Sequence, residues 1–85
     1  MSFWVYVLES ESTGKKYIGY TSDVDRRLRE HNDPVLGRSR YTRKQQGPWR
    51  LLYTEEYPTR AEAMSRERYL KTGQGRAWLQ GQLSR

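Results

Sequence analysis

Cysteine is absent from this 85-residue chain, which excludes disulfide bonds and any zinc site built on thiolates. Long hydrophobic runs are also missing. The apolar run Phe3–Leu8 is too short for the core of a signal peptide and far too short to span a membrane. No internal repeat, low-complexity tract or interdomain linker interrupts the chain. We therefore expect one small, soluble, cytoplasmic domain over residues 1–85.

Acidic residues are scarce relative to basic ones, ten against sixteen, so the formal net charge is +6. Twelve of the sixteen are arginines, whose planar guanidinium group can bind phosphate through two hydrogen bonds. Residues 26–50 contain eight basic side chains but only two acidic ones, with two aromatic residues between them. Such a stretch is typical of a nucleic-acid-binding surface, although a basic surface can also serve solubility alone. We assign nucleic-acid binding in particular to Arg38, Arg40, Arg43 and Lys44.

The order of apolar runs and turn residues predicts an α+β fold, with a small three-stranded antiparallel sheet flanked by helices in the order ββαβαα. Strands are predicted over Phe3–Leu8, Lys16–Tyr20 and Trp49–Glu56. Ser22 followed by Asp25 predicts the start of a first helix that ends at Asn32.

Two more helices are predicted after the third strand. Thr59 with Glu62 indicates the start of the second, and Gly73 indicates its end. A short third helix is expected around Arg76–Leu83, although Gly81 weakens it.

The second predicted helix contains one misplaced carboxylate. On a helical wheel Glu67 falls inside the apolar arc that includes Ala63 and Leu70, whereas Glu62 points outward. A carboxylate on the core side is costly unless it is paired or binds a metal ion. An ion pair with Lys71, one turn later, or with an arginine of another element would satisfy it without any catalytic role.

The first predicted helix separates its charged residues in a similar way. Val24 and Leu28 mark its inner stripe, and Arg27 and His31 lie beside this stripe. Three further charged residues face away from it, namely Arg26, Arg29 and Glu30. A structural ion pair would explain Arg27, and an ordinary position at the border of the core would explain the single histidine.

Tyr6 and Tyr17 lie on the first two predicted strands. With a turn centred near residues 11–13, we expect them roughly opposite each other. Gly19 would permit close approach of the backbone or of a substrate, or would mark a bulge. Packing alone is the alternative role for each tyrosine.

Together these residues resemble a known family. The order and spacing of VYVL, YIG, Arg27, His31 and the later RExxLK segment resemble the GIY-YIG nuclease superfamily over roughly residues 3–72. The resemblance is to small single-domain bacterial members, similar to the nuclease domain of the Slx1 endonucleases. The YIG triplet is intact at residues 17–19, whereas Trp4-Val5-Tyr6 keeps only the tyrosine of GIY.

The resemblance implies a metal-dependent endonuclease that hydrolyses DNA phosphodiester bonds and acts in DNA repair or recombination. It implies a catalytic set, which is Tyr6, Tyr17, Arg27, His31 and Glu67. Arg27 would contact the scissile phosphate, Glu67 would bind Mg²⁺ or Mn²⁺, and one of the tyrosines, preferably Tyr17, would accept the proton of the attacking water. The expected DNA is branched or single-stranded. A non-catalytic nucleic-acid-binding module, or a subunit that needs a protein partner, remains the alternative. Nothing in the sequence fixes the oligomeric state.

Overall fold

A computed structural model describes residues 1–33 and 48–84. Its elements follow the predicted α+β order ββαβαα. They are β1 (Phe3–Ser10), β2 (Lys16–Thr21), α1 (Val24–Asn32), β3 (Trp49–Tyr57), α3 (Arg60–Leu70) and α4 (Gly73–Leu83). The basic residues assigned above to nucleic-acid binding, Arg38, Arg40, Arg43 and Lys44, lie outside the described residues.

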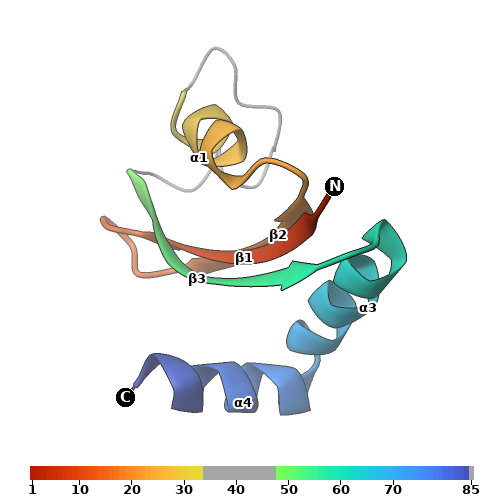
Figure 1. Ribbon diagram of the computed structural model, residues 1–85. Coiled ribbons are helices and arrows are strands. Elements are labelled where there is room, and N and C mark those ends of the chain that lie inside the picture. Colours follow the sequence, from red (N-terminus) through yellow and green to blue (C-terminus); the bar gives the residue numbers. More distant parts are fainter. Residues whose placement is uncertain (34–47, 85) are drawn as a thin grey trace.

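The sheet has the strand order β2-β1-β3, and both pairings are antiparallel, as predicted. Helix α1 lies on one side of this sheet, and α3 and α4 lie on the other (Figure 1). Because side chains alternate between the two faces of a strand, β1 contributes residues to the hydrophobic clusters on both sides of the sheet. Val5 and Val7 pack in one cluster with residues of α3 and α4, whereas Tyr6 and Leu8 pack in a second cluster with Leu28 of α1.

The hairpin turn lies at residues 11–13 as predicted, but Tyr6 and Tyr17 are not directly opposite each other. Tyr6 pairs with Gly19 and Tyr17 pairs with Leu8, so the two tyrosines are diagonal neighbours and not opposite each other. The strand pairing is centred between residues 12 and 13, so the residue opposite Tyr6 is Gly19, two positions after Tyr17. Diagonal residues on one face still contact each other when their side chains are long. The tyrosine rings accordingly lie 6.2 Å apart.

The helix starts were predicted in part. Asp23, and not Ser22, caps α1, because its Oδ1 accepts a hydrogen bond from the backbone N–H of Arg26 at 3.1 Å. Thr59 caps α3 as predicted, with its side chain accepting from the backbone N–H of Glu62.

The ends of the last two helices also differ from the prediction. Helix α3 ends at Leu70, before the predicted end at Gly73. Gly73 instead opens α4, which is longer than the predicted C-terminal helix because Thr72 caps it through the backbone N–H of Gly75.

Asn32, the last residue of α1, fastens this helix to β3. Its side-chain amide donates to the carbonyl oxygen of Trp49 at 3.0 Å and accepts from the backbone N–H of the same residue. Because both hydrogen bonds are made to backbone atoms, they fix the end of α1 over the sheet whatever side chain occupies position 49. This anchor positions the preceding residue, His31, against β1.

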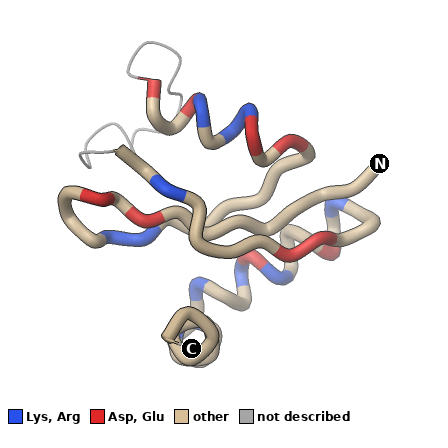
Figure 2. Tube along the Cα trace, turned by 60° about the vertical axis from the view of Figure 1, so that its left-hand side comes forward, with Lys and Arg blue, Asp and Glu red and all other residues tan. Residues whose placement is uncertain are grey.

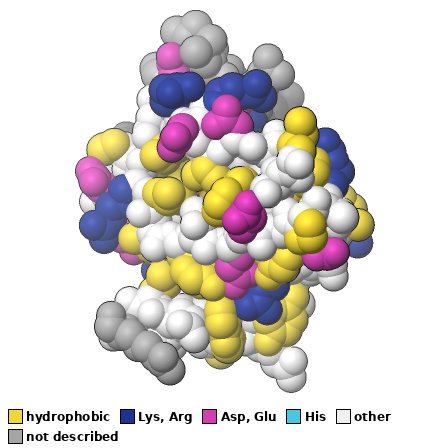
Figure 3. All heavy atoms as spheres, in the orientation of Figure 1, with side chains coloured by type: hydrophobic (Ala, Val, Ile, Leu, Met, Phe, Trp, Pro, Cys, Tyr) yellow, Lys and Arg dark blue, Asp and Glu magenta, His cyan; other side chains and the backbone are white. Residues whose placement is uncertain are grey.

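Charged residues occur on both sides of the sheet, along α1 and along α3, with acidic residues interspersed among the basic ones (Figure 2). Among the described residues, the face seen in Figure 3 likewise mixes hydrophobic, acidic and basic side chains, which form no continuous basic area there. No helix in residues 1–33 and 48–84 is long and apolar enough to cross a membrane.

Candidate active site

A polar cleft of about 380 Å³ brings together four of the five predicted catalytic residues. Tyr6, Tyr17, Arg27 and Glu67 all line it. They come from four elements, β1, β2, α1 and α3, and span 61 positions of sequence from first to last. The fifth residue, His31, does not line the cleft and lies behind Tyr6. Other lining residues are Phe3, Gly19, Tyr20, Thr21, Ser22, Arg26 and Arg60.

His31 and Tyr6 form a buried pair. The Tyr6 hydroxyl and Nε2 of His31 are 3.0 Å apart and hydrogen-bonded, and the residues are 2% and 7% exposed. The ring of Tyr17 packs against the same imidazole, with 4.8 Å between centroids. The histidine thus contacts both tyrosines and fixes how each is presented to the cleft.

Burial changes the acid–base properties of this pair. Loss of hydration raises the pKa of Tyr6 to about 12, although the Arg27 guanidinium acts in the opposite direction. Burial, followed by the nearby charge of Arg27, lowers the pKa of His31 to about 4. At neutral pH the tyrosine therefore keeps its proton and the imidazole is uncharged.

Gly19 makes room for the tyrosines. A Cβ atom at this position would lie 2.6 Å from the Tyr6 hydroxyl oxygen and 3.1 Å from Cε1 of Tyr17. Carbon atoms in contact are normally about 3.5–4.0 Å apart, so no side chain fits here without displacing a ring. Of the two roles expected for Gly19, close approach is the one that the structure supports. The groups that approach the glycine are the side chains of Tyr6 and Tyr17.

Arg27 is held at the cleft by Glu30. Its Nη1 atom donates to Oε1 of Glu30 at 3.0 Å, and Arg26 pairs with the same carboxylate at 3.7 Å. Burial acts to lower the pKa of Arg27, but its hydrogen-bonding partners Tyr6 and Glu30 raise it overall. The guanidinium is therefore a fixed positive charge. Arg27 thus forms a structural ion pair and also lines the cleft, so the two alternative roles expected for it occur together.

Glu30 is much less exposed than the sequence predicts. It was expected to face solvent, yet its side chain is only 17% exposed because it lies between two arginines. The spacing of three residues between Arg27 and Glu30 was a usable signal for this contact. Arg60 was also missed: it lines the cleft from α3 and lies over the ring of Phe3, 5.2 Å from its centroid. No local pattern marks a residue that approaches from a distant helix.

Glu67 presents a carboxylate to the cleft from α3, as the wheel predicted. Its side chain is 16% exposed, and Oε1 lies 3.5 Å from Nζ of Lys71, the partner proposed as its structural alternative. Residues 1–33 and 48–84 contain no group of three or more acidic, histidine or cysteine side chains that could enclose a metal ion. A single carboxylate fits Mg²⁺, which keeps several of its waters and needs few protein ligands.

Comparison with known proteins assigns most of the chain to one family. The family model described as "GIY-YIG catalytic domain" matches residues 2–79. All five predicted catalytic residues lie inside this span.

Similar proteins occur in bacteria and archaea. A UPF0213 protein of Halalkalibacterium halodurans is 43% identical over 72 residues, which are 84% of this chain and 71% of that protein. A UPF0213 protein of Halobacterium salinarum is 45% identical over 67 residues, covering 79% and 82% of the two chains. The solution NMR structure of a UPF0213 protein from Bacillus halodurans matches with a TM-score of 0.55 and 37% identity, over 95% of this chain and 84% of that one.

Proposed function

The chain belongs to the GIY-YIG family, and from this membership we propose that it is a Mg²⁺-dependent endonuclease that hydrolyses phosphodiester bonds of branched or single-stranded DNA. GIY-YIG domains are endonuclease domains that act on DNA with divalent metal ions. The choice of Mg²⁺, the form of the DNA and the roles of the residues are our proposal. One observation supports it most: the cleft gathers two tyrosines, an arginine and a carboxylate, with a buried histidine behind them.

Hydrolysis needs a base that removes a proton from water, and we assign this role to Tyr17. Tyr6 is unsuitable because its pKa of about 12 keeps it protonated at neutral pH. Tyr17 lines the cleft and is less buried than Tyr6, so it can meet solvent.

Tyr6 and His31 position the reactants. The Tyr6 hydroxyl is buried at the cleft wall, and the uncharged imidazole of His31 holds it through the 3.0 Å hydrogen bond. Tyr6 therefore offers a fixed polar group that orients the attacking water or a phosphate oxygen without exchanging a proton at neutral pH.

Arg27 binds the non-bridging oxygens of the scissile phosphate. Its guanidinium is always charged, and Glu30 fixes its direction before the substrate arrives. Because negative charge increases on these oxygens in the transition state, a pre-oriented cation lowers the barrier. Glu67 would hold the Mg²⁺, which when bound supplies positive charge near the leaving oxygen.

The test is cleavage of a labelled panel that contains a single strand, a duplex, 5′ and 3′ flaps and a four-way junction. Each substrate is incubated with Mg²⁺, with Mn²⁺ or with EDTA. We expect wild-type protein to cut at least one branched or single-stranded substrate with metal and none with EDTA. Glu67→Ala should abolish cleavage, whereas Glu62→Ala, which removes an exposed carboxylate of the same helix, should cut like wild type.

Cleavage that survives Glu67→Ala would refute the assignment of the metal ligand. Binding of DNA without cleavage in any metal would replace the enzyme with a non-catalytic binding module, and activity restored by cell extract would indicate a partner subunit. The proposal places the protein in the cytoplasm, which its lack of cysteine favours.

A further inference from the structure

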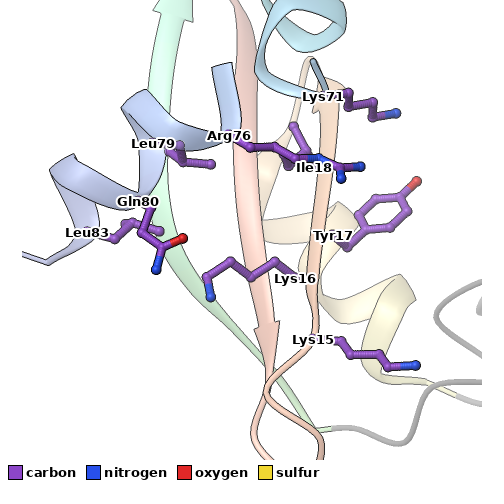
Figure 4. A pocket seen from close by; sticks show the side chains of 9 residues that line it. All are labelled: Lys15, Lys16, Tyr17, Ile18, Lys71, Arg76, Leu79, Gln80 and Leu83. Atoms are coloured by element: carbon purple, nitrogen blue, oxygen red, sulfur yellow. The ribbon is translucent and has the colours of Figure 1, made fainter. Parts of the chain in front are cut away.

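A second pocket, of about 570 Å³, lies at the open edge of β2 where α3 meets α4 (Figure 4). Strand β2 is an edge strand, because its one neighbour among the described strands is β1. The volume is in the range of pockets that bind small organic ligands. Its lining residues are Lys15, Lys16, Tyr17, Ile18, Lys71, Arg76, Leu79, Gln80 and Leu83.

The charged lining of this pocket is entirely basic. It contains three lysines and one arginine and no acidic side chain. Lys16 and Lys71 already have partners, since they pair with Glu9 at 3.4 Å and with Glu67 at 3.5 Å. Lys15 and Arg76 are exposed, and within residues 1–33 and 48–84 neither forms an ion pair. Two cations are thus available for an anionic ligand.

The floor of the pocket is apolar. Ile18 and Leu83 are half-buried and pack against the hydrophobic cluster between the sheet and α4, whereas Leu79, only 3% exposed, belongs to that cluster itself. An apolar floor with a basic rim fits a ligand that is flat and apolar in one part and anionic in another. An unpaired nucleotide has this composition, because its base is a π-surface and its phosphate is an anion.

The pocket and the catalytic cleft share a lining residue and an ion pair. Tyr17 lines both, and Lys71 of the pocket pairs with Glu67 of the cleft. In Figure 4 the Arg76 side chain extends from α4 toward β2, whereas Tyr17 and Lys15 point away from α4. A strand that leaves the cleft past Tyr17 would therefore meet Arg76 and Lys15 at the edge of β2 before it reaches the apolar floor.

We propose that this pocket is a subsite for an unpaired nucleotide of the DNA substrate, one or two positions from the scissile phosphate. Lys15 and Arg76 bind the phosphates, and the base rests on Ile18 and Leu83. A base can enter only where it is not held in a duplex, so the pocket selects single-stranded or branched DNA. This inference rests on the proposed function, because it assumes that the neighbouring cleft binds a DNA strand.

The first test measures binding without cleavage. Affinity for a labelled single-stranded oligonucleotide of about 16 nucleotides is measured in EDTA over a range of salt concentrations. Each phosphate contact on single-stranded DNA contributes about 0.7 to the slope of log K against log salt. The double variant Lys15→Gln with Arg76→Gln should therefore lower the slope by about 1.4.

The control removes the same charge elsewhere. Arg68→Glu also lowers the total charge of +6 by two, and Arg68 is exposed, lies outside the basic stretch 26–50 and lines neither pocket. It should leave the slope within about 0.3 of wild type. If Arg68→Glu lowers the slope as much as the Lys15→Gln/Arg76→Gln variant does, the cations of the pocket have no special role and the proposal is wrong.

The second test removes the base from the substrate and leaves the protein intact. A single abasic residue is placed at successive positions of the oligonucleotide around the cleavage site. Affinity should fall about tenfold at one or two adjacent positions, as for the loss of one buried base. The Lys15→Gln/Arg76→Gln protein should be less sensitive at these positions. Equal affinity at every position would refute the base-binding part.

Failure of this inference can be told apart from failure of the proposed function. Metal-dependent cleavage with no slope difference and no abasic effect refutes the subsite alone. A slope difference and an abasic effect without cleavage in any metal refute the enzyme and support the subsite. Absence of binding to any DNA refutes both.

Discussion

Gly19→Ala is the smallest change that should disturb the candidate site. The added Cβ would lie 2.6 Å from the hydroxyl oxygen of Tyr6 and 2.7 Å from its Cζ atom, about 1 Å inside normal contact. The Tyr6 ring cannot retreat easily, because it is 2% exposed, packs with Leu8 and Trp49, and is hydrogen-bonded to His31. The backbone or the ring must therefore move.

The cost follows from the overpacking. Forcing an extra methyl group into a packed region destabilises a protein by about 1–3 kcal/mol, and each kcal/mol lowers Tm by about 4–8 °C in a domain of this size. A displacement of about 1 Å in a positioning group costs about 10²-fold in rate. We therefore expect thermal denaturation to show a fall in Tm of at least about 4 °C, and cleavage of the best substrate to fall by about 10²-fold.

Gly81→Ala is the matched control. Nothing lies within 4 Å of a Cβ at this position in α4, so the variant should be as stable as wild type or up to about 1 kcal/mol more stable. A Gly19→Ala protein with wild-type Tm and cleavage would refute the reasoning. A double variant with Tyr6→Leu gives a further check. If the clash is with the Tyr6 ring, the combined loss of stability should be smaller than the sum of the single losses.

Three more predictions follow from the site and its supports. Arg27→Lys should lower the single-turnover cleavage rate by about 10²-fold because lysine lacks the bidentate guanidinium, whereas Arg29→Lys on the exposed face should not. His31 has a pKa of about 4 in the folded protein, below its ordinary value of 6.5, so between these pH values the unfolded chain binds one more proton than the folded protein. The uncharged histidine therefore contributes up to about 3 kcal/mol to the free energy of unfolding above pH 6.5, and this contribution is lost as the pH falls toward 4. Urea unfolding at pH 7 and pH 4.5 measures this loss, and a His31→Gln protein that shows the same loss would contradict it. Gly75→Ala should destabilise the protein more than Gly81→Ala, measured by the same unfolding, because its Cβ would overlap the backbone oxygen of Tyr69.

Much of the fold could be predicted because its signals are local. Apolar runs mark the strands, and the capping residue Thr59 marks the start of α3. The details that failed depend on contacts that no local pattern specifies. Ser22 and Asp23 are both residue types that cap helices well. Asp23 takes this position because the end of β2 holds its backbone, where the backbone N–H of Asp23 donates to Oγ1 of Thr21 at 3.1 Å. The offset between Tyr6 and Tyr17 likewise depends on the exact strand pairing, which a turn predicted near residues 11–13 did not fix to the residue.

The candidate site shows the same division between local and distant information. The period of a helix was enough to predict that Arg27 and Glu67 face inward. The contact between Tyr6 and His31 joins residues 25 positions apart, and it depends on the anchor that Asn32 makes to the backbone of β3. No spacing within one helix encodes that anchor. The basic pocket was missed for a similar reason, since its four cations come from two strand- or helix-connecting turns, from β2 and from α4.

Strands β1 and β2 place the candidate catalytic residues on one face of the sheet and the hydrophobic cluster with α3 and α4 on the other. Tyr6, Tyr17 and Gly19 face the cleft, while Val5 and Ile18 next to them pack in the core beside α3 and α4. Because side chains alternate, a slip of one residue in the pairing would exchange the two faces, so folding and the arrangement of the site depend on one register. A substitution in these strands will therefore change stability and activity together. Arg27 on α1 and Glu67 on α3 lie outside these strands and belong to neither hydrophobic cluster, so substitutions of these two residues report more directly on chemistry.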